Sequence, residues 1–124
     1  MNEGLVTRIQ FEEYVANAIG LLPEKIRTQM ENVEFVVEDG ESPGGRLLGL
    51  YFGVPQTKRG NNYSFVLPDK ITLYKATIER SAGNKENIRG LVIHVVWHEI
   101  GHHFGYSEPA IRELENKWIE KGAI

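Results

Sequence analysis

Apolar and polar positions follow two different spacings along the chain, and these spacings predict where helices and strands lie. Near the N-terminus, apolar residues at helical spacing predict a helix over residues 11–19, and Pro23 suits the first turn of a second, short helix. From residue 85 to Gly105, apolar positions again repeat every three to four residues, which predicts a long central helix. Ser107 is a good N-cap residue for a last helix with one apolar face.

Extended segments fill the part of the chain between these helical regions. Runs of β-prone apolar residues predict strands over residues 33–37, 47–52, 64–67 and 71–74. Turn-forming residues at 38–45 separate the first two strands, and Pro68-Asp69 separates the last two. Residues 75–80 could form a further helix, which the turn signal at residues 81–84 would end.

Length and composition limit the kinds of protein to which this chain can belong. At 124 residues, of which 41% are hydrophobic and 25% charged, the chain is expected to form one compact domain over residues 1–124. The net charge of -3 and the scattered Lys and Arg residues argue against nucleic acid as a partner. The absence of cysteine excludes disulfides and thiolate metal sites, which leaves imidazole and carboxylate groups as metal ligands. No run is apolar enough to span a bilayer and no signal-peptide pattern is present, so we expect no membrane partner and a cytoplasmic protein.

The predicted central helix carries the pattern H-E-x-x-H. It reads His98-Glu99-Ile100-Gly101-His102, and two histidines four residues apart lie one turn apart on the same helix face. Both imidazoles can therefore reach one zinc ion. Glu99 lies about 100° around the helix from His98, which places it near the metal without making it a ligand. The pattern predicts zinc on His98 and His102, with Glu99 as the general base that acts on water.

A third metal ligand is required, because catalytic zinc generally has three protein ligands and one open position. Gly105 lets the chain reverse after the central helix, and Glu108 would then return a carboxylate towards the same ion. Glu113, Glu115 and Glu120 are alternative ligands if the last helix packs across the central one.

Two further histidines flank the motif. His94 lies one turn before His98 and would form an alternative pair with it, but the histidines at 94, 98 and 102 cannot all bind one ion. The outer two are about 12 Å apart along a straight helix. We expect His94 to be packed or to support the site indirectly. His103 points about 100° away from His102, which favours a structural or hydrogen-bonding role.

Several segments together resemble known metallopeptidases. The stretch from His98 to Glu108 resembles the pattern H-E-x-x-H-x-x-G-x-x-(H/D) of the metzincin group. The whole chain resembles more closely the small bacterial zincin-like metallopeptidase family, and this likeness covers most of the chain from about residue 11 onward. The segments that carry it are NV at 32–33, LLGLYFGVP at 47–55, LPDKITLY at 67–74 and HEIGHHFG at 98–105.

This resemblance implies both a fold and an activity. The implied fold is α+β, with a small mixed sheet behind the metal-binding helix, and the implied zinc ligands are His98, His102 and the residue at position 108. Relatives usually carry Asp at that last position, and Glu108 is one methylene longer. The implied activity is hydrolysis of peptide or protein substrates by a metal-activated water, with Glu99 as general base. The alternative hypothesis is a zinc-stabilised binding or regulatory module with little or no peptidase activity.

Overall fold

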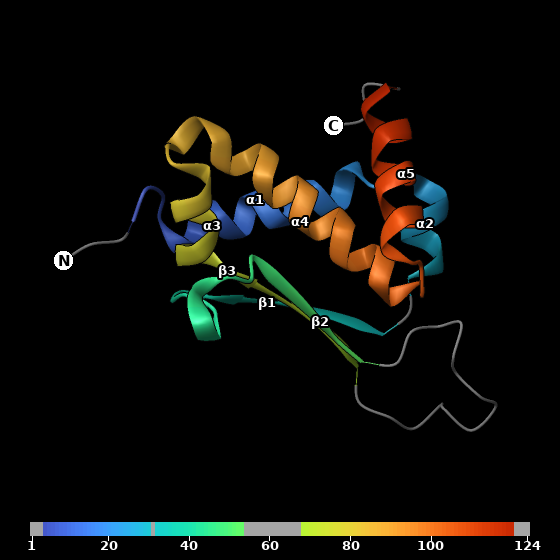
Figure 1. Ribbon diagram of the computed structural model, residues 1–124, viewed down its shortest axis with the longest axis horizontal. Helices are drawn as coiled ribbons and strands as arrows, with labels where there is room; N and C mark the ends of the chain where they lie inside the picture. The colour runs from blue at the N-terminus through green and yellow to red at the C-terminus, as the bar shows by residue number, and fades with distance from the viewer. Residues whose placement is uncertain (1–3, 31, 54–67, 121–124) are drawn as a thin grey trace.

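The computed structural model describes residues 4–30, 32–53 and 68–120, and shows helices stacked on one side of a small sheet (Figure 1). The elements follow one another as α1 (Arg8–Leu21), α2 (Glu24–Gln29), β1 (Val33–Glu38), η1 (Pro43–Gly45), β2 (Gly49–Phe52), β3 (Asp69–Tyr74), α3 (Lys75–Ala82), η4 (Lys85–Asn87), α4 (Ile88–His103) and α5 (Glu108–Glu120). The fold class is therefore α+β, as expected.

The sheet is mixed, and its central strand is β3. Its order is β1-β3-β2, with β1 parallel and β2 antiparallel to β3. Side chains alternate between the two faces, as the two-residue period of a strand requires. Phe35 and Ile71 point towards the helices. On the opposite face, Lys70 is paired laterally with Glu34 of β1 and with the exposed Phe52 of β2.

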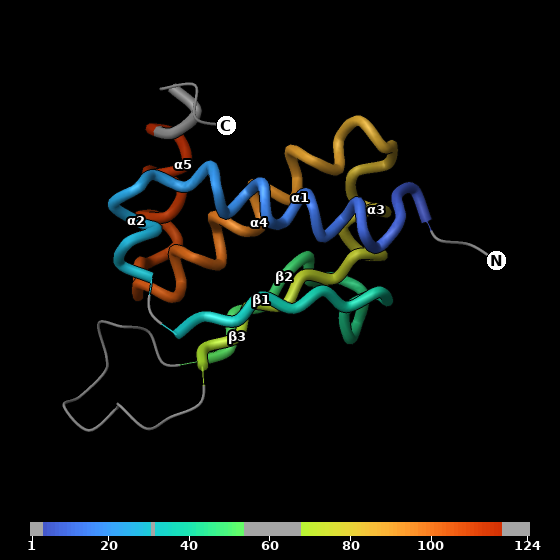
Figure 2. Tube along the Cα trace, turned by 180° about the vertical axis from the view of Figure 1, so that it is seen from behind, coloured from blue at the N-terminus to red at the C-terminus, as the bar shows by residue number. Residues whose placement is uncertain are grey.

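Helix α4 is the centre of the molecule. It packs against α1, α3, α5, β2 and β3, and Figure 2 shows from behind how α1 lies against it above the sheet. Because α4 contacts several neighbours, it buries more than one side, including Val92, Val96 and Trp97. The indole Nε1 of the fully buried Trp97 donates to the carbonyl of Ala18 at 3.2 Å and so joins α4 to α1.

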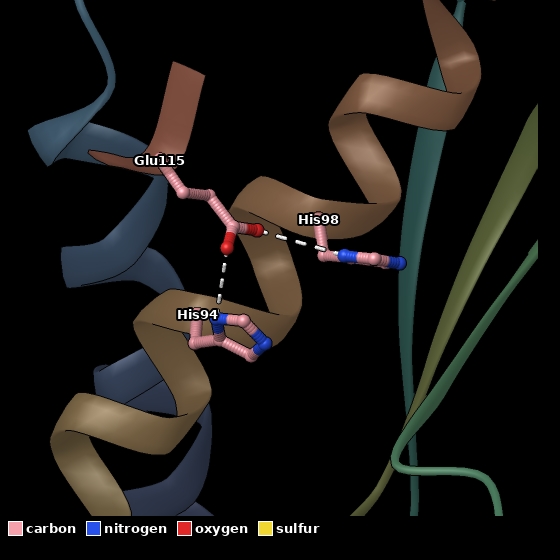
Figure 3. A group of neighbouring side chains, drawn as sticks. All are labelled: His94, His98 and Glu115. Atoms are coloured by element: carbon pink, nitrogen blue, oxygen red, sulfur yellow. Dashed lines mark ion pairs between the residues drawn. The ribbon is translucent and has the colours of Figure 1, made fainter. Parts of the chain in front are cut away.

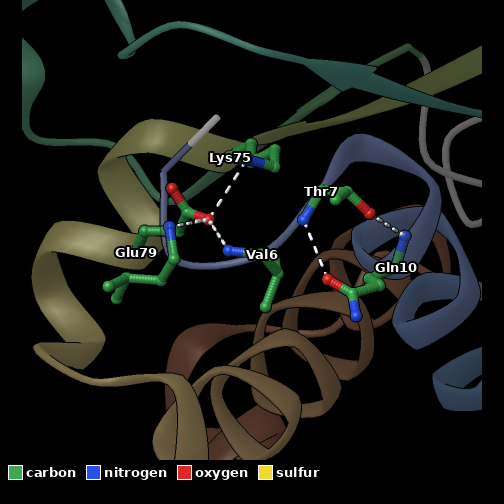
Figure 4. Close-up of polar contacts among 6 residues, drawn as sticks. Val6, Thr7, Gln10, Lys75 and Glu79 are labelled. Atoms are coloured by element: carbon green, nitrogen blue, oxygen red, sulfur yellow. Dashed lines mark hydrogen bonds and ion pairs between the residues drawn. The ribbon is translucent and has the colours of Figure 1, made fainter. Parts of the chain in front are cut away.

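The N-terminal segment is fastened at two points (Figure 4). Thr7 and Gln10 form a capping box at the start of α1, in which each side chain accepts from the backbone N–H of the other residue. The buried Glu79 Oε2 accepts from the backbone N–H of Val6 at 3.0 Å and from Nζ of Lys75 at 3.1 Å. These contacts join the beginning of the chain to α3.

Within the described residues, the predicted helices and strands are confirmed except at their edges. Strand β3 begins at Asp69 rather than at residue 71, because Asp69 already pairs with Val33. The central helix begins as the short helix η4, capped by Asn84, before the regular turns of α4 start at Ile88. The predicted strand at residues 64–67 lies outside the described residues.

Candidate metal centre

His98, His102 and Glu108 meet at the C-terminal end of α4. The two imidazole rings, one helical turn apart, have their centroids 5.0 Å apart. Glu108 Oε1 lies 3.3 Å from Nε2 of His98 and 3.0 Å from Nε2 of His102. Ligand atoms about 2.0–2.1 Å from a tetrahedral zinc ion lie about 3.3 Å from one another. The carboxylate oxygen therefore lies from each imidazole nitrogen at about the distance that separates two ligand atoms of one zinc ion.

The turn between α4 and α5 brings Glu108 to this position. Gly105 has a φ of 83°, a conformation that side chains disfavour, and its N–H donates to the carbonyl of His102 at 2.9 Å. Two residues later, the hydroxyl of Ser107 accepts from the N–H of Ala110 and caps α5. Glu108 is the first residue of α5, directly across the turn from the histidines. The expected chain reversal and cap are both confirmed.

Gly101 allows α5 to pack closely on α4. A Cβ atom at this position would lie 2.5 Å from Cγ1 and 2.8 Å from Cδ1 of Ile111, a residue of α5 that is 2% exposed. Only hydrogen fits between the helices at this point. Because Glu108 belongs to the same helix as Ile111, the small residue between the two motif histidines helps to set the distance from Glu108 to their rings.

We therefore expect Gly101→Ala to lower the free energy of unfolding by about 1–3 kcal/mol through overpacking. Gly90 in the same helix is the matched control, because a Cβ there meets no atom within 4 Å. Gly90→Ala should raise stability by about 0.5–1 kcal/mol through helix propensity. Urea unfolding of the metal-free proteins measures both changes, and equal shifts for the two substitutions would contradict the packing argument.

Glu99 lies between α4 and the sheet rather than on the surface. It is 8% exposed, and the backbone N–H of Tyr51 in β2 donates to its carboxylate. Gly49 makes this approach possible, since a Cβ there would lie 2.6 Å from Val95 Cγ1 and 3.4 Å from Glu99 Cγ. Burial raises the pKa of the Glu99 carboxyl above its ordinary value, while the charges of His102 and His98 and the bond from Tyr51 act in the opposite direction.

A buried polar network follows immediately after the motif. His103, which is fully buried, places Nδ1 2.8 Å from Oδ2 of Asp69, and the hydroxyl of Tyr51 donates to the same oxygen at 2.6 Å. Asp69 is 1% exposed. The hydrogen-bonding role expected for His103 is thus confirmed. Through these contacts β2 and β3 hold the end of α4 that carries His102.

Comparison with known proteins places the chain in a family of metallopeptidases. A model of a family described as zincin-like metallopeptidase matches residues 30–118, most of the chain. The chain belongs to this family. No curated protein matches the chain. Membership implies a metal, typically zinc, and the zincin-like motif of this chain coincides with the residues that the fold brings together.

The alternative ligands on the last helix of this zincin-like chain occupy different places. Glu113 is exposed, and its Oε1 lies 3.9 Å from Nζ of Lys117. The side chain of Glu120 lies outside the described residues. Glu115 is buried and reaches His98, but at Nδ1 rather than at Nε2 (Figure 3).

Tyr51, Tyr74 and Tyr106 differ in their relation to the proposed centre, and Tyr51 contacts Glu99. Tyr106 is partly exposed and stacks on Phe104, and Tyr74 is buried in β3. Tyr51 contributes its backbone N–H to Glu99 and its hydroxyl to Asp69. Sequence reasoning missed Asp69 because Pro68-Asp69 was interpreted as a turn between strands. A polar residue opening a strand of alternating apolar positions is the signal that marks it.

No helix in the described part of the chain combines the length and the apolar character needed to cross a bilayer.

Proposed function

We propose that this protein is a zinc-dependent peptidase in which His98, His102 and Glu108 hold the ion and Glu99 transfers protons. The observation that carries the proposal is the position of Glu108 Oε1, within 3.3 Å of Nε2 of both motif histidines. A buried carboxylate with a raised pKa lies beside them on the same helix. The two motif histidines and the proposed proton-transfer group thus share α4, and α5 supplies the third proposed ligand.

The donor set fits zinc. Two imidazole nitrogens and one glutamate oxygen form a set that catalytic zinc commonly uses, and it leaves a fourth position open for water or substrate. All three side chains remain partly exposed, with Glu108 about half-exposed, so substrate can reach this position. The additional methylene of Glu108 is accommodated by the turn at Gly105, because the observed spacing already matches that of zinc ligands.

Each residue has a definable part in hydrolysis. Zinc, when bound, supplies a Lewis acid that polarises the scissile carbonyl and acidifies water. Glu99 accepts the proton of the attacking water and donates it to the leaving amine. Burial favours the protonated form of Glu99, and the N–H of Tyr51 favours the ionised form, so the two influences allow the carboxyl to both take and release a proton.

Strand β2 offers a place for an extended substrate. In the described part of the sheet it is an edge strand, paired only with β3. Because the Tyr51 N–H bonds to Glu99, the edge of β2 adjoins the proposed catalytic carboxylate. A peptide added along this edge by backbone hydrogen bonds would pass the metal ligands. We propose extended peptides as the substrate class.

We also propose that residues 1–124 form a single domain. The proposal is supported by one hydrophobic core that runs from Val6, through Phe11 of α1 and Ile71 of β3, to Phe104 at the end of α4. The metal centre lies at the edge of this core.

Zinc content tests the proposed site. Protein purified without added metal or chelator should contain about one zinc ion per chain by elemental analysis, as expected for a single three-ligand site. His102→Ala should abolish binding, and Glu108→Ala should weaken it. Glu113→Ala, which removes an exposed carboxylate from the same helix as Glu108, is the matched control and should bind as the wild type does. A wild-type protein that binds no zinc even in excess metal would refute the proposal.

A further inference from the structure

We infer that Glu115 is a positioning residue. Its carboxylate accepts a hydrogen bond from Nδ1–H of His98 and thereby keeps the lone pair of Nε2 free for the metal. The inference rests on the proposed function, since it concerns how one proposed ligand is prepared for the ion. Under this inference Glu115 is not the third metal ligand.

The contacts of the Glu115 carboxylate support this assignment. Its two oxygens divide between two imidazoles of α4: Oε2 lies 3.3 Å from Nδ1 of His94, and Oε1 lies 3.5 Å from Nδ1 of His98 (Figure 3). Oε1 is buried and has no hydrogen-bond partner within the described structure. A buried carboxylate oxygen without a partner requires a donor. The Nδ1–H of His98, which it faces, is the donor that a small rotation of the ring would supply.

Glu115 lies on the opposite side of the His98 ring from the proposed ion, so it is not a ligand of that ion. The two nitrogens of an imidazole lie at different edges of the ring and face different neighbours. Nε2 of His98 faces Glu108, whereas Nδ1 faces Glu115. A neutral imidazole carries a hydrogen on one nitrogen and a lone pair on the other. A carboxylate that accepts from Nδ1 therefore selects the tautomer whose lone pair is on Nε2, as in the carboxylate–histidine–zinc arrangements of many metal sites.

One helix supplies both contacts to His98. Glu108 and Glu115 are seven residues apart on α5, about two turns, and so lie on nearly the same face. The close packing of Ile111 on Gly101 lies between them along the helix. Helix α5 thus contacts the His98 ring at Nε2 through Glu108 and at Nδ1 through Glu115. The packing of α5 on α4 sets the orientation of this ligand.

His94 provides a control for the inference. It is half-exposed and meets the other oxygen of Glu115, so it is not part of the contact that selects the His98 tautomer. Removing His94 should leave zinc binding unchanged. The competing arrangement is a second ion held by His94, His98 and Glu115, and it predicts a different result. The zinc content would then exceed one ion per chain, and the excess would disappear in His94→Ala.

The experiment compares zinc dissociation constants, measured by competition with a chromophoric chelator, for wild type, Glu115→Leu, Glu115→Gln and His94→Ala. Loss of a carboxylate that orients a ligating histidine typically weakens metal binding about 10–100-fold, which is the result expected for Glu115→Leu. Glu115→Gln keeps an oxygen acceptor and the same shape, so it should bind more tightly than the Leu variant. Should the Leu variant fail to fold, the Gln variant must still bind more weakly than wild type.

A spectroscopic measurement separates orientation from general destabilisation. Long-range ¹H–¹⁵N spectra of the metal-free protein at alkaline pH report which nitrogen of His98 carries the hydrogen. Wild type should show the Nδ1–H tautomer, and Glu115→Leu should shift towards the Nε2–H tautomer.

The failures of the two proposals differ. Equal zinc affinity for wild type and Glu115→Leu, or an Nε2–H tautomer of His98 in wild type, would overturn the inference and leave the proposed site intact. A second zinc ion that disappears in His94→Ala would also overturn it, because Glu115 would then be a ligand. Absence of zinc from wild type would refute the proposed function and this inference together.

Discussion

Glu99→Gln is expected to lower the rate of peptide hydrolysis by about 10²–10⁴-fold while zinc remains bound, because general acid–base catalysis contributes an effect of that size. The amide has nearly the shape of the carboxylate, and its oxygen can still accept from the N–H of Tyr51. It cannot take a proton from water. A peptide library analysed by mass spectrometry identifies cleavable sequences, and the rate on one of them is compared with zinc content.

The matched control for this substitution is Glu113→Gln, an exposed carboxylate of α5 that should retain full activity. Undiminished hydrolysis by zinc-loaded Glu99→Gln would contradict the assigned part of Glu99. If wild type binds zinc but cleaves no peptide in the library, the result favours the alternative of a zinc-stabilised binding or regulatory module.

The stability of Glu99→Gln distinguishes loss of chemistry from loss of structure. Burial raises the pKa of Glu99 in the folded state, so its contribution to stability is present at low pH and is lost as pH rises through the folded pKa. At neutral pH the buried charge therefore opposes folding of the metal-free protein. Gln carries no charge, and the variant should melt at a higher temperature than wild type at neutral pH, with the difference shrinking in acid.

The motif could be predicted from sequence because it is local. The geometry of a regular helix is sufficient to place residues 98 and 102 on one face, and their rings are neighbours in the structure. Gly105 and Ser107 have conformational and capping preferences that belong to the residues themselves, so the turn that returns Glu108 was also predictable. The role of His98, His102 and Glu108 as metal ligands stays a prediction.

The contacts around the motif depend on packing between distant segments, which periodicity does not encode. The alternatives Glu108, Glu113 and Glu115 could not be separated from sequence, because the crossing of α5 over α4 decides which carboxylate reaches which nitrogen. Gly101 illustrates the same limit. In a helix it lowers stability relative to alanine, and its use becomes evident only beside Ile111.

The burial of Glu99 was also outside the reach of a helical pattern. A single amphipathic face predicts one buried side for α4, but this helix contacts the sheet as well as α1 and α5. The face that carries Glu99 is covered by β2, a strand that approaches closely because residue 49 is glycine. Sequence alone identified the carboxylate, and the sheet determines its environment.

The largest loss of stability is expected for Asp69→Ala, which should lower the free energy of unfolding by about 2–6 kcal/mol, because each of two buried donors left without its acceptor costs about 1–3 kcal/mol. Asp69 and His103 are both almost fully buried, and Tyr51 donates to the same carboxylate oxygen. Removing the acceptor leaves the hydroxyl and the imidazole N–H buried without it. Chemical unfolding of the metal-free protein measures the change.

Two controls separate this loss from weaker polar effects. Glu12→Ala removes an exposed i, i+4 partner of Arg8 and should change stability by about 0.5 kcal/mol or less. Tyr51→Phe removes one donor but leaves Asp69 and His103 together, and should cost about 1–2 kcal/mol. Were Asp69→Ala as stable as Glu12→Ala, the network would not be what holds the end of α4 on the sheet. Stability should therefore be lowest for Asp69→Ala, intermediate for Tyr51→Phe and highest for Glu12→Ala. Asp69→Ala leaves two buried donors without an acceptor, Tyr51→Phe removes one of those donors, and Glu12→Ala affects no buried donor.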